Sequence, residues 1–146
     1  IGALDQGRTA RSLAYLLGKF DRTKLYFIAP DEMQIGKDIL AYLDDHRVAY
    51  ELLPSPERVL PDVDVVYQTR IDRSRLKGRD INLAAYNIDA AVLGRMKSNA
   101  IIMHPLPRSV EIDHAVDADP RAAYFRQTRN GLFLRMALLT MVFDKD

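Results

Sequence analysis

Cysteine does not occur among the 146 residues of this sequence. Its absence excludes disulfide bonds, thiolate zinc sites, iron–sulfur clusters and cysteine nucleophiles, and it fits a reducing compartment. An excess of charge of one sign is also lacking, because 21 basic and 20 acidic residues leave a net charge of +1. Bulk electrostatics therefore gives no reason to expect binding to nucleic acid or to an anionic membrane. No apolar run approaches the ~18 residues that a membrane-spanning helix needs.

Signature motifs of several enzyme classes are missing as well. The sequence has no Gly-rich phosphate or dinucleotide loop, no His-Glu-x-x-His zinc motif and no Gly-x-Ser-x-Gly nucleophile elbow. His46, His104 and His114 do not have the spacing of metal ligands, and no pair of carboxylates stands out for glycosidase chemistry. The residues by themselves therefore predict no metal site and no complete catalytic set.

Length and composition indicate one globular domain. Hydrophobic residues make up 48% of the chain and charged residues 28%, a balance that excludes disordered and fibrous classes. A chain of this length buries about 68–70% of its unfolded surface, which is enough for a proper core. The first residues, Ile1 to Leu4, include no initiator Met, no basic segment and no signal-peptide pattern. We expect residues 1–146 to form a single domain that is a piece of a longer chain.

Short apolar segments alternate with helical patterns along the chain. Buried strands are predicted at residues 24–29, 63–69 and 100–103, with a weaker one at 47–52. Amphipathic stripes predict a helix from near Thr9 with Phe20 on its apolar face, a second around 39–43, and a third over 89–96 with Asp89 as its N-cap. This alternation predicts an α/β fold of the Rossmann-like, doubly wound kind, with a mainly parallel sheet and helices on both faces.

The C-terminal segment has a different composition. From residue 132 to residue 143 only Arg135 and Thr140 interrupt an apolar run. A helix that is apolar on all sides must be buried on all sides. The segment therefore either runs through the core or packs against a partner outside this sequence, and we favour the partner.

The first candidate loop precedes the first helix. Asp5-Gln6-Gly7-Arg8-Thr9 follows a short apolar segment, where helix N–H groups attract anions and Arg8 adds a planar fork suited to a carboxylate or phosphate. An ordinary strand–loop–helix turn, with Gly7 for the turn and Thr9 for the cap, explains the same residues. Spacing alone slightly favours that ordinary turn.

Two further loops follow predicted strands, at the edge where open α/β sheets bind their ligands. Residues 70–80 contain five basic and two acidic side chains, and Arg70 stands out because it directly follows its strand. In His104-Pro105-Leu106-Pro107-Arg108 the prolines predict a rigid, extended loop whose carbonyls can accept hydrogen bonds from an amine. A solvated loop and a simple strand terminator are the structural alternatives, and His104 without partners is not assigned as a base.

These loops, taken together, carry a resemblance. Its residues are Gly7-Arg8-Thr9, Tyr67-Gln68-Thr69-Arg70-Ile71, His104-Pro105-Leu106-Pro107-Arg108 and a long closing stretch from Val116 to Leu139. In this order they resemble the aspartate carbamoyltransferase family, specifically its C-terminal, aspartate-binding domain. The resemblance covers essentially the whole chain, and the residues of several segments are most similar to those of plant plastid and some bacterial members.

The resemblance implies an activity and a set of roles. The family transfers the carbamoyl group of carbamoyl phosphate to the amino group of L-aspartate, early in pyrimidine synthesis, without metal or organic cofactor. By resemblance Arg8 binds the α-carboxylate with Thr9 beside it, and Arg70 binds the side-chain carboxylate. The carbonyls of Pro105 and Leu106 hold the attacking amine. Two separated arginine forks suit a dicarboxylate.

Other implications concern the rest of the enzyme. The family's phosphate loop, Ser-Thr-Arg-Thr-Arg, and its lysine loop do not occur here. The carbamoyl-phosphate domain is therefore expected as a partner, and the chain alone is expected to be inactive. By resemblance the complete enzyme is expected to be a homotrimer. Neither nucleic acid nor membrane is expected as a partner. The expected location is the cytoplasm, or the plastid stroma for a plant protein. By resemblance Arg75 matches an arginine that holds the family's mobile loop closed. Asp72 stands where the family has Gln, and its carboxylate repels the substrate carboxylate unless a neighbouring cation neutralises Asp72.

Two alternative functions remain open. Ornithine carbamoyltransferases have a Cys in the corresponding His-Cys-Leu-Pro loop, where this sequence has Pro105, which argues against that specificity. The second alternative is a non-catalytic, Rossmann-like module that binds a small anion or only another subunit.

Overall fold

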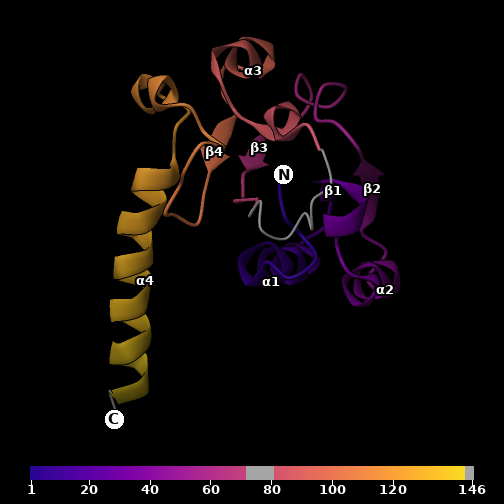
Figure 1. Cartoon of the computed structure of the whole chain (residues 1–146). Coiled ribbons are helices and arrows are strands. Elements are labelled where there is room, and N and C mark those ends of the chain that lie inside the picture. The colour runs from indigo at the N-terminus through magenta and orange to yellow at the C-terminus, as the bar shows by residue number, and fades with distance from the viewer. Residues whose placement is uncertain (72–80, 144–146) are drawn as a thin grey trace.

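The computed structural model describes residues 1–71 and 81–143. Helices and strands alternate along them, with η marking 3-10 helices (Figure 1). Their order is α1 (Arg8–Leu17), β1 (Lys24–Ile28), η1 (Asp31–Met33), α2 (Lys37–Asp45), β2 (Ala49–Leu53), β3 (Val65–Tyr67), η3 (Leu83–Tyr86), α3 (Ala90–Arg95), β4 (Ile101–Met103), η4 (His114–Ala118) and α4 (Tyr124–Phe143). Each of the four predicted strands is present, although β3 is shorter than its apolar segment.

The strands form two parallel pairs that the N-terminal residues join into one layer. β1 pairs with β2 and β3 pairs with β4. Between the pairs, the Gly2 N–H donates to the Ile28 carbonyl at 3.0 Å, and the Thr69 N–H donates to the Ile1 carbonyl at 2.8 Å. The layer therefore runs β2, β1, residues 1–4, β3, β4, and the predicted mainly parallel arrangement is confirmed.

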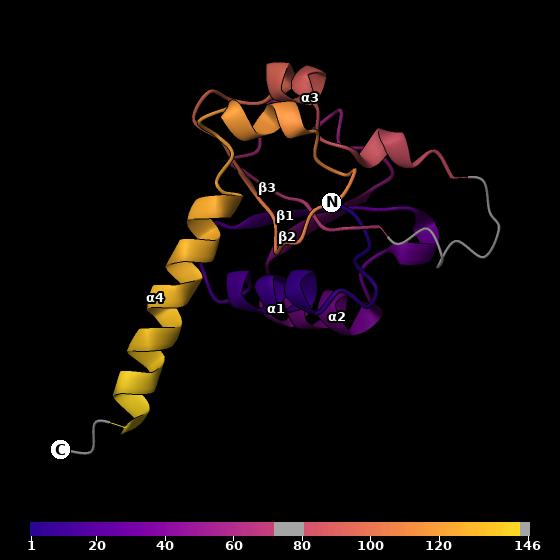
Figure 2. The same cartoon turned by 60° about the vertical axis from the view of Figure 1, so that its left-hand side comes forward.

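Helices cover both faces of this layer (Figure 2). Alternate strand residues point to opposite faces, so Phe27 packs with α1 and α2 while its neighbour Ile28 packs with the other core cluster. That second cluster includes Leu93 of α3 and Val116 of η4. The predicted doubly wound α/β fold is confirmed, and solved structures reported below share it.

The ends of the helices can be compared with two single-residue predictions, the N-cap at Asp89 and the buried position of Phe20. Asp89 caps α3 as predicted, because its side chain accepts a hydrogen bond from the Val92 N–H at 2.9 Å. The prediction for Phe20 is wrong: α1 ends at Leu17, the chain turns at Gly18, and Phe20 is 58% exposed. An added Cβ at Gly18 would lie 2.7 Å from the Tyr42 ring, so close packing of α1 against α2 favours glycine there.

α4 extends away from the rest of the chain (Figure 1). Only Tyr124, at its first residue, is buried. The large apolar side chains of its second half, such as Leu134 and Met141 at 63% and 75%, are more than half exposed. The alternative in which this helix runs through the core is therefore wrong. Within the described residues, no helix combines the length and the hydropathy needed to cross a membrane.

Candidate functional site

The three predicted loops leave the same edge of the sheet. Residues 1–4, β3 and β4 are neighbours in the parallel layer. The loops that begin at Asp5, Arg70 and His104 therefore leave the layer side by side, and we call these three points the exits. Thr69 ties two of these exits together, since its N–H and its hydroxyl both donate to the Ile1 carbonyl, at 2.8 and 3.0 Å. The Gln68 N–H donates to the Met103 carbonyl at 2.9 Å and ties the third. The tertiary structure thus brings together loops that are about 60 and 100 residues apart in sequence.

The first exit is the N-terminus of α1. Gly7 is its N-cap, and an added Cβ there would lie only 2.8 Å from the Ala3 carbonyl oxygen. No side chain caps this end and no acidic residue occupies the first turn, so its backbone N–H groups keep their positive potential. Arg8 and Thr9 are exposed here. The expectation that Thr9 caps the helix is wrong, because the helix already begins at Arg8.

The second exit carries Arg70 beside a cavity. Arg70 is exposed, and within the described residues it forms no ion pair. A cavity of about 420 Å³ adjoins it, lined by Gln68, Arg70, Ile71, Leu83, Asn87, Ser109, Val110 and Glu111. Gln68 is fully buried; its Nε2 donates to the Thr69 carbonyl at 3.1 Å, while its Oε1 has no partner in the described part of the chain. An unpaired acceptor in this wall favours ligands or side chains that donate hydrogen bonds.

The third exit is the proline loop, and His104 organises it. His104 is 2% exposed. Its Nδ1 accepts a hydrogen bond from the Leu106 N–H at 2.8 Å, and its Nε2 lies 3.0 Å from Glu111 Oε1. Leu106 adopts a φ of +49°, which non-glycine residues adopt uncommonly. The predicted rigid loop is therefore held by a buried side chain as well as by its prolines.

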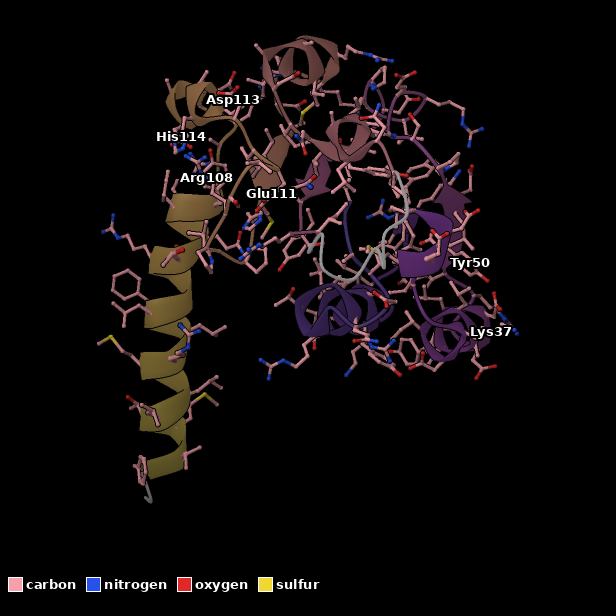
Figure 3. All side chains as sticks on the ribbon, in the orientation of Figure 1. Lys37, Tyr50, Arg108, Glu111, Asp113 and His114 are labelled. Atoms are coloured by element: carbon pink, nitrogen blue, oxygen red, sulfur yellow. The ribbon has the colours of Figure 1, made fainter. Side chains whose placement is uncertain are left out.

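A second network joins the end of this loop to α4. Arg108 donates to the Ile112 carbonyl at 2.9 Å and pairs with Asp117. The Tyr124 hydroxyl donates to the other oxygen of the Asp117 carboxylate. Figure 3 shows Arg108, Glu111 and His114 gathered near β4 and the start of α4, while its labelled Lys37 and Tyr50 lie on the far side of the molecule. Loop and helix therefore share one polar junction.

Some site residues were not found from the sequence. Gln68 lies inside the Tyr67–Ile71 motif, and Ser109 and Glu111 follow the proline loop, but the sequence assigns no role to any of the three. Asp72 and Arg75 lie outside the described residues, so their predicted roles stay predictions. Among residues 1–71 and 81–143, no group of three or more His, Asp or Glu side chains is arranged to hold a metal ion.

Comparisons with known proteins agree on one family. Residues 1–142 match the family described as aspartate/ornithine carbamoyltransferase, Asp/Orn binding domain. The chloroplastic aspartate carbamoyltransferase of Arabidopsis thaliana is 52% identical over an alignment of 146 positions, which covers 97% of this chain and 37% of that protein. The enzyme of Oryza sativa subsp. japonica is 47% identical, with 97% and 40% covered.

A solved structure extends this agreement to the fold. Aspartate transcarbamoylase of Trypanosoma cruzi, in complex with carbamoyl aspartate and phosphate, superposes with a TM-score of 0.89 and 40% identity, covering 95% of this chain and 46% of that one. The chain spans less than half the length of each of these relatives. It belongs to the Asp/Orn-binding domain family of the aspartate/ornithine carbamoyltransferases.

Proposed function

We propose that this chain is the aspartate-binding domain of an aspartate carbamoyltransferase, the enzyme that makes N-carbamoyl-L-aspartate and phosphate for pyrimidine synthesis. The observation that carries the proposal is the shared exit edge of the three loops. Two guanidinium groups, on Arg8 and Arg70, leave neighbouring strands beside a loop rich in carbonyl acceptors. A dicarboxylic amino acid presents two anions and one amine, which this set complements.

Each group has a defined task in the reaction. Arg8, with Thr9 and the N–H groups of α1, holds the α-carboxylate, and Arg70 holds the side-chain carboxylate. The carbonyls of Pro105 and Leu106 accept hydrogen bonds from the amine, and within the described residues neither carbonyl has another donor. The unprotonated amine nitrogen then forms a bond to the carbamoyl carbon while the bond from that carbon to the phosphate oxygen breaks. The proton that the nitrogen loses is taken up by the leaving phosphate. Holding the nucleophile in place supplies up to about 7–11 kcal/mol in ideal cases.

The remaining cationic donors must come from elsewhere in the enzyme. No phosphate-binding loop for carbamoyl phosphate occurs in these 146 residues. The chain alone is therefore inactive in our proposal, and its partner is the carbamoyl-phosphate domain, within a homotrimer. The exposed apolar half of α4 is the surface that meets that domain. The chloroplastic relatives support the plastid stroma as the location if the protein is from a plant, and the cytoplasm is our proposal otherwise.

The choice between aspartate and ornithine as substrate rests on the charge of Arg70, because the fold is shared by both kinds of enzyme. Ornithine ends in an ammonium group, which Arg70 repels, whereas aspartate ends in a carboxylate, which Arg70 binds. Pro105 also stands where the ornithine enzymes have Cys. The curated relatives named above are all aspartate carbamoyltransferases, which supports the same choice.

Calorimetry with succinate and L-aspartate tests the proposal. We expect binding by the chain, and a decrease in affinity of about 10- to 150-fold for Arg8→Ala and for Arg70→Ala, because each loses a charge-assisted pair worth about 1.5–3 kcal/mol. Arg95→Ala is the matched control: this exposed arginine ends α3, before the chain enters β4 at the edge of the sheet opposite the three loops. Arg70→Ala binding as well as the unsubstituted chain would refute the assignment.

Complementation separates an enzyme domain from a binding module. Adding a carbamoyl-phosphate domain in trans should restore formation of N-carbamoyl-L-aspartate, and Arg70→Ala should abolish it. A folded chain that binds succinate but never supports turnover would instead support the non-catalytic alternative.

A further inference from the structure

We propose that His104 is a positioning residue, which rests on the function proposed above: it accepts the Leu106 N–H while its ring lies against the buried Glu111 carboxylate, and so fixes the backbone whose carbonyls receive the substrate amine. His104 itself does not touch the substrate in this proposal. Its contribution is to hold Leu106 in one conformation before the substrate arrives.

The backbone around Leu106 offers few other ways of being held. Pro105 and Pro107 have no N–H, so Leu106 supplies the one backbone donor of residues 105–107. That donor reaches His104 Nδ1 at 2.8 Å. The φ of +49° at Leu106 is one that a leucine adopts only where its surroundings enforce it. The acceptor of this single N–H therefore decides the geometry of the loop.

The contacts also fix the protonation state of the imidazole. Nδ1 accepts a hydrogen bond, so it carries no proton, and the ring proton is on Nε2, which lies 3.0 Å from Glu111 Oε1. Burial lowers the pKa of His104, against the opposite effect of Glu111, which agrees with a neutral ring. The lone pair of the neutral ring, on Nδ1, is engaged by the Leu106 N–H, and only 2% of the residue is exposed. His104 therefore has no free position from which to act as a base.

Both ends of the bridge are anchored in turn. Glu111 Oε1 also accepts the Ser109 N–H at 2.9 Å, so one carboxylate holds two points of the same loop. The His104 N–H donates to Gln127 Oε1 of α4 at 3.1 Å. His104 thus links β4, the proline loop and α4, the first two through its ring and the third through its backbone N–H. The other two histidines, His46 and His114, are exposed and lack such a bridge.

Two substitutions of His104 separate positioning from general structure. In His104→Asn the side-chain oxygen takes the place of Nδ1 and accepts the Leu106 N–H. In His104→Gln the amide takes the place of Nε2 and leaves that N–H without its acceptor. We expect His104→Asn to bind L-aspartate within about threefold of the unsubstituted chain and His104→Gln to lose at least about tenfold, the order of effect that follows from misplacing a binding group. Succinate has no amine, so its affinity should change much less in both variants. His46→Gln, at the exposed C-cap of α2, is the matched control and should bind normally.

A ligand-independent readout runs in parallel. Hydrogen exchange of the Leu106 amide should accelerate in His104→Gln and not in His104→Asn, and the nitrogen NMR signals of His104 should report an unprotonated Nδ1. If His104→Gln does not fold, comparing Glu111→Leu with Glu111→Gln poses the same question. Only the glutamine keeps a polar oxygen beside Nε2 and an acceptor for the Ser109 N–H. Faster exchange and weaker binding are then expected for Glu111→Leu alone.

The outcomes distinguish this inference from the proposed function. Arg70-dependent binding together with equal affinities for His104→Asn and His104→Gln would overturn the positioning role and leave the function standing. Absence of Arg70-dependent binding would refute the function. In that case hydrogen exchange of the Leu106 amide would still test whether His104 holds the loop. Exchange that stays as slow in His104→Gln as in the unsubstituted chain would overturn the positioning role too.

Discussion

The side-chain pair of Asp119 and Arg121 should make a stability contribution that depends on pH. Arg121 donates through Nε and Nη2 to the two Asp119 oxygens, both at 2.9 Å, and through Nη1 to the Leu93 carbonyl at 2.8 Å. The next residues pair with β4, where the Ala123 N–H donates to the Ile102 carbonyl at 2.8 Å. The pair therefore fastens the end of α3 to the strand that carries the proline loop.

The pKa of Asp119 gives the magnitude. Hydrogen bonds from Arg121 lower the pKa of this carboxyl from 3.8 to about 2. A decrease of that size corresponds to roughly 2 kcal/mol, and screening by solvent at this partly exposed pair leaves about 1–2 kcal/mol. Since the folded state favours the ionised form, the contribution is complete at pH values above the ordinary pKa. It is lost as the pH falls from there through the pKa of about 2.

Urea unfolding of Asp119→Asn, followed by circular dichroism, tests this reasoning. At pH 7 the variant should lose about 1–2 kcal/mol in the free energy of unfolding, and the difference should shrink towards pH 2 as the native carboxylate is protonated. Asp64→Asn, which breaks the exposed Lys97–Asp64 pair, is the control and should change stability by less than about 1 kcal/mol. A difference for Asp119→Asn that stays the same at both pH values would refute an ionic origin.

Three further substitutions are tested by the same unfolding measurement. Gly2→Ala should cost more than about 3 kcal/mol, because Gly2 has a φ of +119° and an added Cβ would lie 2.3 Å from the Thr69 carbonyl oxygen; normal stability would contradict this. Gly94→Ala, where an added Cβ meets nothing within 4 Å, should instead gain about 0.5–1 kcal/mol in α3, and a loss would count against it. Tyr124→Phe removes the hydroxyl that donates to Asp117 and should cost about 1.5–3 kcal/mol, with no change being the contrary result.

Patterns that act over a few residues determined much of the fold from the sequence. The apolar segments predicted all four strands. Asp89 was also predicted correctly as the N-cap of α3, because an N-cap side chain bonds to an N–H only three residues away. The rule that ligands bind where parallel strands end selected Arg8, Arg70 and the proline loop, and the structure places all three at one edge. The resemblance to the family rests on these same loops.

Contacts between distant residues were decided only by the tertiary structure. Residues 1–4 lie in the middle of the layer because Ile1 bonds to Thr69, 68 residues away, and no local pattern records that partner. Phe20 is exposed because α1 stops where it packs against α2. His104 carries no sign of a role in the sequence, since its significance depends on Leu106 and Glu111 being folded around a buried ring. Local chemistry therefore fixed which elements form, while the burial of polar groups, each requiring a partner, fixed how the loops at the site are held.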